Sequence, residues 1–186
     1  MTVEAAVRSV TVFGGSRVPP EHPEYAAARR FGRAMAERGF TLVTGGYNGV
    51  MEAISLGAHE GGGRAVGVTV QVIGDAQVPN AYLTEEIQTA ALLERIDKLV
   101  ELGDGFVILP GGAGTLAELA VVWNLAILRA LQDKPIVVVG AAWATLLRGM
   151  VEGQLHVVDA DLGRLTFVGD VDAAVDAISA RLRPSP

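Results

Sequence analysis

The sequence repeats a unit in which a short β-branched run leads into glycines and then into a helical segment. Three such units begin at Val10–Phe13 before Gly14-Gly15-Ser16, at Thr41–Thr44 before Gly45-Gly46-Tyr47-Asn48-Gly49, and at Phe106–Leu109 before Pro110-Gly111-Gly112-Ala113-Gly114-Thr115. Strands that alternate with helices in this way form parallel sheets. The sequence therefore predicts an α/β fold, a Rossmann-like doubly wound parallel sheet with helices on both faces.

The same signals predict the other elements. Further strands are expected at 65–70, 136–139 and 165–168, and helices at 23–39, 50–60, 89–102, 116–131, 143–150 and 170–182. Asp170 is the expected N-cap of the last helix. The segment from Gln71 to about Gln88 is expected to be a long loop, which is either functional or a surface excursion with a helical turn near Thr84–Ile87.

Length, charge and composition exclude several classes of protein. A chain of 186 residues fits one domain, 1–186. The net charge of −6 argues against binding long nucleic acid, although backbone N–H groups can still hold a small anion. The longest near-apolar stretch, Pro135–Leu147, is shorter than the ~20 residues of a membrane helix. The start, Met1–Val10, lacks signal-peptide character, and the chain has no cysteine, so a cytoplasmic protein without membrane contact is expected.

The glycine loops predict a phosphate site. Parallel strands place all three loops at one edge of the sheet, where phosphate oxygens can approach backbone N–H groups at helix starts. For any single loop, a tight turn is the competing explanation. For Thr115 and Glu118, a capping box is the competing explanation. The expected phosphate- and nucleotide-binding residues are Gly15, Ser16, Gly45, Gly46, Gly49, Gly111, Gly112, Gly114 and Thr115.

Other nucleotide motifs do not fit. Gly112, Gly114 and Ala117 match the dinucleotide pattern G-x-G-x-x-A, but the strand that follows ends in Val139-Gly140 without the acidic residue that holds a ribose. The triphosphate motif G-x-x-x-x-G-K-[ST] does not occur in the sequence. Nicotinamide and ATP chemistry are therefore not expected.

One arginine stands out on the helix expected at 89–102. Arg95 lies at the border of an apolar stripe, where a guanidinium needs a carboxylate or phosphate partner. An ordinary salt bridge or a snorkelling side chain is the alternative. Glu118 opens the next helix and could face the same pocket. The expected stripe consists of Leu92, Ile96, Leu99 and Val100.

Metal and pyridoxal chemistry have no good candidates. His22, His59 and His156 are scattered without metal-ligand spacing, so no metal is predicted. The two lysines, Lys98 and Lys134, are expected on a polar helix face and at the wrong end of a strand. A Schiff base with pyridoxal phosphate is therefore not expected.

Taken together, these motifs make residues 8 to 150 resemble the LOG (Lonely Guy) family of cytokinin riboside 5′-monophosphate phosphoribohydrolases, formerly mislabelled lysine decarboxylases. The motif P-G-G-x-G-T-x-x-E occurs in full at 110–118. The resemblance extends to Gly14-Gly15-Ser16, to Gly45-Gly46-Tyr47-Asn48-Gly49-Val50-Met51-Glu52 and to Glu94-Arg95.

The resemblance implies an enzyme that uses no cofactor. It would hydrolyse the N-glycosidic bond of a nucleoside 5′-monophosphate, AMP or an N6-modified AMP, to free base and ribose 5-phosphate, as in cytokinin activation. Arg95 and Glu118 would be the catalytic pair, the loop 111–115 the phosphate cradle, and Met51 a neighbour of the base. A carboxylate can stabilise the oxocarbenium-like transition state of this reaction. The alternative is a non-catalytic nucleotide or molybdenum-cofactor carrier or sensor.

A homodimer is also expected. The family is typically dimeric, and the helix predicted at 116–131 is apolar on nearly all sides, interrupted only by Glu118, Asn124 and Arg129. Such a helix needs cover on every side, which either its own domain or a second copy can supply.

Overall fold

The computed structural model describes residues 8–71, 78–153 and 155–182. Seven described strands form one sheet in the order β4-β3-β2-β1-β5-β6-β7, and every neighbouring pair is parallel. This is the predicted doubly wound Rossmann-like α/β fold. The strands are β1 (Ser9–Phe13), β2 (Thr41–Thr44), β3 (Ala65–Val70), β4 (Glu85–Thr89), β5 (Gly105–Ile108), β6 (Ile136–Val139) and β7 (Thr166–Val168).

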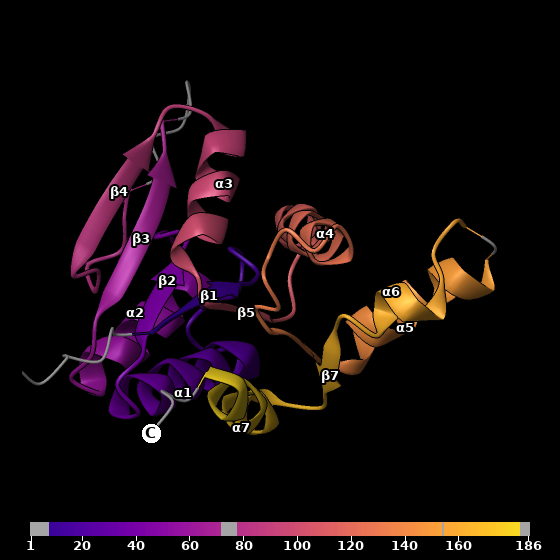
Figure 1. Ribbon diagram of the computed structural model, residues 1–186. Helices are drawn as coiled ribbons and strands as arrows, with labels where there is room; N and C mark the ends of the chain where they lie inside the picture. The colour runs from indigo at the N-terminus through magenta and orange to yellow at the C-terminus, as the bar shows by residue number, and fades with distance from the viewer. Residues whose placement is uncertain (1–7, 72–77, 154, 183–186) are drawn as a thin grey trace, which may run out of the picture.

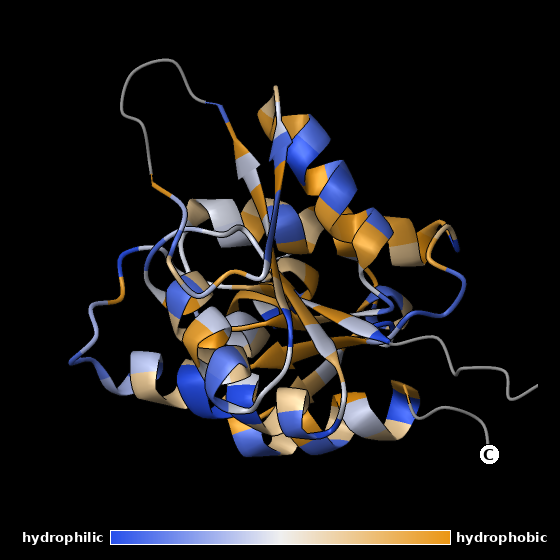
Figure 2. Cartoon of the chain, turned by 90° about the vertical axis from the view of Figure 1, so that its left-hand side faces the viewer, coloured by the Kyte–Doolittle hydropathy of each residue, from blue (hydrophilic) through white to orange (hydrophobic). Residues whose placement is uncertain are grey.

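Helices cover both faces of the sheet (Figure 1). One core cluster joins α1, α2 and α7 to the sheet, and the other joins α3, α4 and α5. Figure 2 shows hydrophobic strands between helices with hydrophilic outer sides. The helices are α1 (Pro23–Glu37), α2 (Val50–Glu60), α3 (Leu92–Leu102), α4 (Ala113–Ile127), α5 (Ala141–Glu152), α6 (Asp159–Leu162) and α7 (Val171–Leu182).

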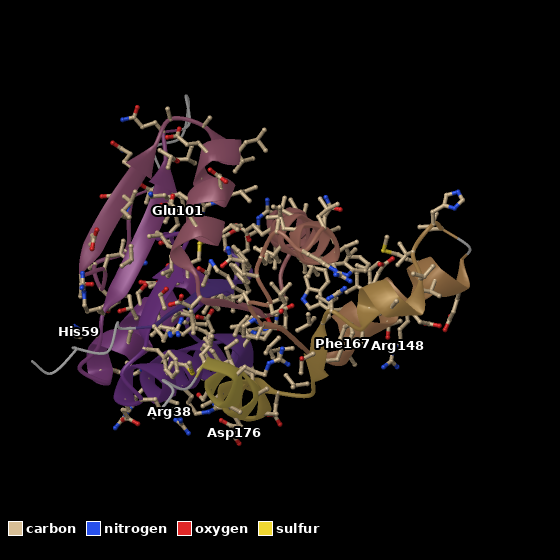
Figure 3. All side chains as sticks on the ribbon, viewed as in Figure 1. Arg38, His59, Glu101, Arg148, Phe167 and Asp176 are labelled. Atoms are coloured by element: carbon tan, nitrogen blue, oxygen red, sulfur yellow. The ribbon has the colours of Figure 1, made fainter. Side chains whose placement is uncertain are left out.

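The helix ends follow local sequence signals. Pro23 is the first residue of α1, and the His22 imidazole accepts a hydrogen bond from the Glu24 N–H. The Asp170 carboxylate accepts one from the Ala173 N–H, which confirms the predicted N-cap. On the outer surface, Arg38 at the end of α1 and Asp176 of α7 form an exposed ion pair (Figure 3).

The sheet contains one strand that the sequence did not predict. β4 lies within the segment expected to be a loop and pairs with β3 over its whole length, from Val66 opposite Glu85 to Val70 opposite Thr89. The helical turn expected near Thr84–Ile87 is therefore wrong, and α3 begins at Leu92 rather than Thr89. Of the expected loop, residues 72–77 lie outside the described part, as do residues 1–7 of the expected N-terminal segment.

Helix α4 begins earlier than predicted, and this changes the role of two residues. Gly112 is the N-cap and Ala113 the first helical residue, and no side chain caps this end. Thr115 therefore lies inside the first turn, and the capping box considered for Thr115 and Glu118 is wrong. The side chains of both residues are available for another purpose.

The strand order places a crevice at the centre of the sheet. The chain builds outward from β1 to β4 on one side, returns through α3, and builds outward again from β5 to β7 on the other. The carboxyl ends of β1 and β5 therefore lie at the point where the winding reverses, where open α/β sheets bind their ligands. None of the helices in the described part of the chain has the length and apolar character that a membrane span requires.

Candidate active site

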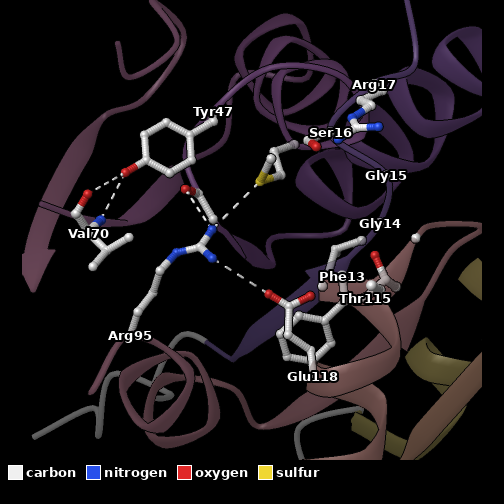
Figure 4. Close-up of a pocket in the computed structure, with 16 residues that line it drawn as sticks. Phe13, Gly14, Gly15, Ser16, Arg17, Tyr47, Val70, Arg95, Thr115 and Glu118 are labelled. Carbon is white, nitrogen blue, oxygen red and sulfur yellow. Dashed lines mark hydrogen bonds and ion pairs between the residues drawn. The ribbon is translucent and has the colours of Figure 1, made fainter. Parts of the chain in front are cut away.

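A pocket of about 850 Å³ opens at this reversal point (Figure 4). It lies between the loops that follow β1, β2 and β5, and Arg95 of α3 and Glu118 of α4 enter it from the side. The lining residues are Val12, Phe13, Gly14, Gly15, Ser16, Arg17, Gly45, Tyr47, Met51, Val70, Arg95, Gly112, Ala113, Gly114, Thr115 and Glu118.

Backbone hydrogen bonds hold the three loops together. The Gly15 N–H donates to the Pro110 carbonyl (3.0 Å), which joins the β1 loop to the β5 loop. The Gly15 carbonyl accepts from the Val50 N–H (2.9 Å), which joins the β1 loop to the start of α2. The buried Asn80 amide donates to the carbonyls of Gly46 and Tyr47, both at 3.1 Å, and so holds the β2 loop in place. The pocket rim is therefore one connected unit.

The glycines of these loops serve two different purposes. A Cβ on Gly45 would lie 1.7 Å from Nη2 of Arg95, and a Cβ on Gly49, whose φ is +70°, would lie 2.5 Å from the Gly15 carbonyl oxygen. These two positions need glycine for close packing. By contrast, a Cβ on Gly112 or Gly114 would meet no described atom within 4 Å. Their lack of side chains leaves space at the mouth of the pocket, beside the N-terminus of α4.

Arg95 is buried and held by backbone carbonyls. Its Nε donates to the Val68 carbonyl (2.8 Å) and its Nη2 to the Gly45 carbonyl (3.1 Å). Nη2 also lies 3.8 Å from the Met51 sulfur. The guanidinium is not at the surface, as a snorkelling side chain would place it. Among the residues expected beside it in a buried stripe, Ile96, Leu99 and Val100 are buried, but Leu92 is exposed.

Glu118 faces Arg95 across the pocket. Its Oε1 lies 3.8 Å from Arg95 Nη1, and the two side chains are only 12% and 11% exposed. Burial raises the pKa of the Glu118 carboxyl to about 7, and the Arg95 charge opposes that rise. At neutral pH this carboxyl can therefore both accept and release a proton, as a general acid or base requires.

The structure brings together most of the predicted site residues. Gly46, Gly49 and Gly111 do not line the pocket and instead shape its loops: Gly46 and Gly49 have positive φ values, and Gly111 packs against Thr115. The predicted residues that line the pocket are Gly15, Ser16, Gly45, Met51, Arg95, Gly112, Gly114, Thr115 and Glu118.

Two pocket residues with polar side chains were not among the predicted site residues. Arg17 directly follows the first glycine loop, is exposed, and takes part in none of the ion pairs between described residues. Tyr47 lies inside the second glycine loop and its ring lies under the Arg95 guanidinium. Their positions in the sequence could have indicated them. Tyr47 interrupts one glycine loop and Arg17 directly follows another, at the edge of the sheet where ligands bind.

The fold and the pocket define a class: a doubly wound α/β protein with a glycine-lined pocket at the carboxyl edge of its sheet. A family model described as "Possible lysine decarboxylase" matches residues 51–178. The chain belongs to this family, which confirms the resemblance to LOG proteins.

Named relatives agree with this assignment, and a solved structure shares the fold. A cytokinin riboside 5′-monophosphate phosphoribohydrolase from Mycobacterium tuberculosis is 35% identical over 165 residues, 85% of this chain and 87% of the relative. One from Mycobacterium marinum is 38% identical over 121 residues, and the match spans 64% of each chain. The molybdenum cofactor binding protein from Rippkaea orientalis has a TM-score of 0.74 at 20% identity, covering 95% of this chain and 98% of that one. This last likeness shows a shared fold alone.

Proposed function

We propose that this protein hydrolyses the N-glycosidic bond of a nucleoside 5′-monophosphate, AMP or an N6-modified AMP, to free base and ribose 5-phosphate. The observation that carries the proposal is the buried Arg95–Glu118 pair, 3.8 Å apart, in the same pocket as an open glycine loop at a helix start. The names of the two mycobacterial relatives support this reaction.

The phosphate would bind at the glycine loops. The N-terminus of the fifteen-residue helix α4 supplies backbone N–H groups and a positive dipole end, and the space beside Gly112 and Gly114 admits phosphate oxygens. Thr115 adds a hydroxyl within the first turn. Arg17 follows the β1 loop, which the hydrogen bond between Gly15 and Pro110 joins to the β5 loop, and it adds a charged donor for the same phosphate. This end of the pocket suits a dianion even though the whole chain is acidic.

The reaction would take place at the charged pair. As the bond between ribose C1′ and the base nitrogen breaks, its electrons leave with the base and positive charge develops on the sugar. The Glu118 carboxylate stabilises that charge and accepts a proton from the water whose oxygen bonds to C1′, and the departing base nitrogen then takes up this proton to give the free base. Arg95 Nη1 holds the ribose or phosphate in position for this step. Because Glu118 must be ionised, we expect the rate to rise with pH through about 7.

Amino-acid decarboxylation, which the family description suggests, has less support. The side chains that line the described pocket include no lysine to form a Schiff base. Lys98 forms an ion pair with Glu101 on the outer side of α3. The second candidate is a carrier of a nucleotide or of the molybdenum cofactor, because the related fold in Rippkaea orientalis belongs to a molybdenum cofactor binding protein.

The direct test is to incubate the purified protein with AMP and with isopentenyl-AMP and to measure free base by chromatography. Glu118→Gln is the test variant, and Glu101→Gln, on an exposed carboxyl outside the pocket, is the matched control. We expect base release by the parent and the control, and a loss of at least about a hundredfold in Glu118→Gln. Calorimetry with AMP shows whether each variant still binds.

Three results separate the candidates. Base release that Glu118→Gln retains would remove Glu118 from the mechanism. AMP binding without base release from either nucleotide would overturn the enzyme proposal and favour a carrier. Neither binding nor release would overturn the assignment of the pocket to nucleoside monophosphates.

A further inference from the structure

Tyr47 connects the end of a strand to the charged pair. Its hydroxyl donates to the Val70 carbonyl and accepts from the Val70 N–H, both at 2.9 Å. Val70 is the last residue of β3, so the phenol is fixed to the sheet at both of its hydrogen-bonding positions. The residue is 7% exposed. A side chain tied in this way has little freedom to turn.

The tied ring lies against Arg95. The guanidinium carbon of Arg95 is 5.5 Å from the centroid of the Tyr47 ring, within the range of a cation–π contact (Figure 4). Desolvated contacts of this kind are worth more than exposed ones, and both side chains here are largely buried. The ring therefore stabilises one face of the guanidinium.

The hydrogen bonds of Arg95 leave one motion uncontrolled. Nε and Nη2, which bind the carbonyls of Val68 and Gly45, lie on the same edge of the guanidinium. Rotation about that edge keeps both donors near their carbonyls but bends and weakens the two hydrogen bonds, and it swings Nη1 out of the plane. Nη1 is the nitrogen that faces Glu118, at 3.8 Å, and within the described part of the chain it forms no shorter polar contact. A contact on the face of the guanidinium therefore opposes this rotation, in addition to the link from Nε to the buried stem of the side chain.

We propose that Tyr47 is a positioning residue for the reaction: its ring, anchored to Val70, fixes the plane of Arg95 so that Nη1 points at Glu118 and the substrate. The proposal rests on the proposed function for its catalytic part. Its structural part, the dependence of the Arg95 orientation on Tyr47, stands without it.

The experiment compares Tyr47→Phe with Tyr47→Leu in the full chain. Phenylalanine keeps the ring but loses both contacts to Val70, and leucine loses the ring as well. With AMP as substrate we expect kcat to fall about threefold in Tyr47→Phe and about tenfold or more in Tyr47→Leu, with KM changed less than about twofold. Tyr82→Leu is the matched control, because Tyr82 is half-buried and does not line the pocket.

The pH profile gives a readout that a general loss of folding would not move. The Arg95 charge lowers the pKa of Glu118, so an Arg95 that turns away from Glu118 lets that pKa rise. The acid limb of the rate profile should therefore move to higher pH in Tyr47→Leu and stay in place in Tyr82→Leu. Thermal unfolding checks that the variants compared are folded.

A second readout needs no activity. Nitrogen-15 NMR of the Arg95 Nε–H, assigned with Arg95→Lys, measures its hydrogen exchange in the free protein. We expect slow exchange in the parent and Tyr47→Phe, and at least about tenfold faster exchange in Tyr47→Leu. If the parent releases no base but this exchange depends on Tyr47, the proposed reaction fails and the positioning role of Tyr47 stands. If exchange and kcat are both unchanged in Tyr47→Leu, the positioning proposal is overturned.

Discussion

Two glycines of the pocket differ in what surrounds their α-carbons, and this difference can be tested. In Gly45→Ala the added methyl would overlap Arg95 Nη2, so Arg95 must move and lose its bond to the Gly45 carbonyl. We expect about 1–3 kcal/mol lower stability and at least about a hundredfold lower kcat/KM. In Gly112→Ala the methyl meets no described atom. We expect a stability change below about 1 kcal/mol but weaker AMP binding, because the methyl would occupy the phosphate space.

Urea unfolding and calorimetry with AMP measure these two effects separately. The pair acts as its own control, since the same substitution is made in both loops. A Gly112→Ala protein that binds AMP as tightly as the parent would show that this glycine does not face the phosphate.

At the residue scale, the sequence predicted the charged pair but not its surroundings. Arg95 lies at the border of an apolar stripe and Glu118 follows a glycine loop, and both features can be recognised in the sequence alone. The partners of Arg95 are not, because the carbonyls of Val68 and Gly45 meet it only through strand pairing and loop closure. Tyr47 was overlooked for the same reason: its role depends on Val70, which is 23 residues away in the chain.

At the scale of elements, buried strands were predicted more accurately than exposed ones. The observed β1, β2, β3, β5 and β6 lie within one residue of their predicted bounds, since runs such as Ile136–Val139 are β-branched and buried throughout. β4 reads Glu-Glu-Ile-Gln-Thr and is mostly exposed, so its sequence carries no strand signal. Backbone pairing to β3 determines its structure. The short α6 was missed because four residues show no helical period.

Helix α3, helix α4 and the residue that ends α4 expose several leucine side chains. Leu93 and Leu128 are 77% and 67% exposed, and Leu92 and Leu116 are exposed as well. Leu119 and Trp123 of α4 are buried against the sheet, so the chain itself covers only part of this apolar helix. We propose that a second copy of the chain covers the remainder in a homodimer.

Sedimentation equilibrium tests this surface. We expect the parent to sediment as a dimer. Leu93→Glu and Leu128→Glu should each raise the dissociation constant of this dimer at least about tenfold, because each substitution would bury a carboxylate in an apolar interface. Leu146→Glu on α5 introduces the same charge at another exposed leucine and should leave the dimer intact. A monomeric parent at all concentrations would rule out the dimer.

At the scale of the whole molecule, Glu118 should make stability depend on pH. Its pKa rises from near 4.5 to about 7 on folding, so the folded protein holds this proton more tightly than the unfolded chain does. The resulting stabilisation is complete below about pH 4.5 and is lost as pH rises to about 7. Glu118→Gln lacks this titration. Between pH 4.5 and 8, its free energy of unfolding should therefore gain roughly 3 kcal/mol relative to the parent.

Urea titrations of both proteins at several pH values measure this difference, and groups common to both cancel in it. Glu101→Gln, which removes an exposed carboxyl outside the pocket, is the matched control for the substitution itself. A difference between Glu118→Gln and the parent that does not change with pH would mean that Glu118 titrates near its ordinary value in the fold.

The two members of the charged pair come from different halves of the sheet. Arg95 lies on α3, which follows β4 and contacts β1 to β4, whereas Glu118 lies on α4, which connects β5 to β6 in the other half of the sheet. Partial unfolding of either half would separate the pair even if the other half stayed intact. The complete pocket exists only in the fully assembled molecule, so any ligand that binds both residues opposes every partial opening that divides the sheet at its centre.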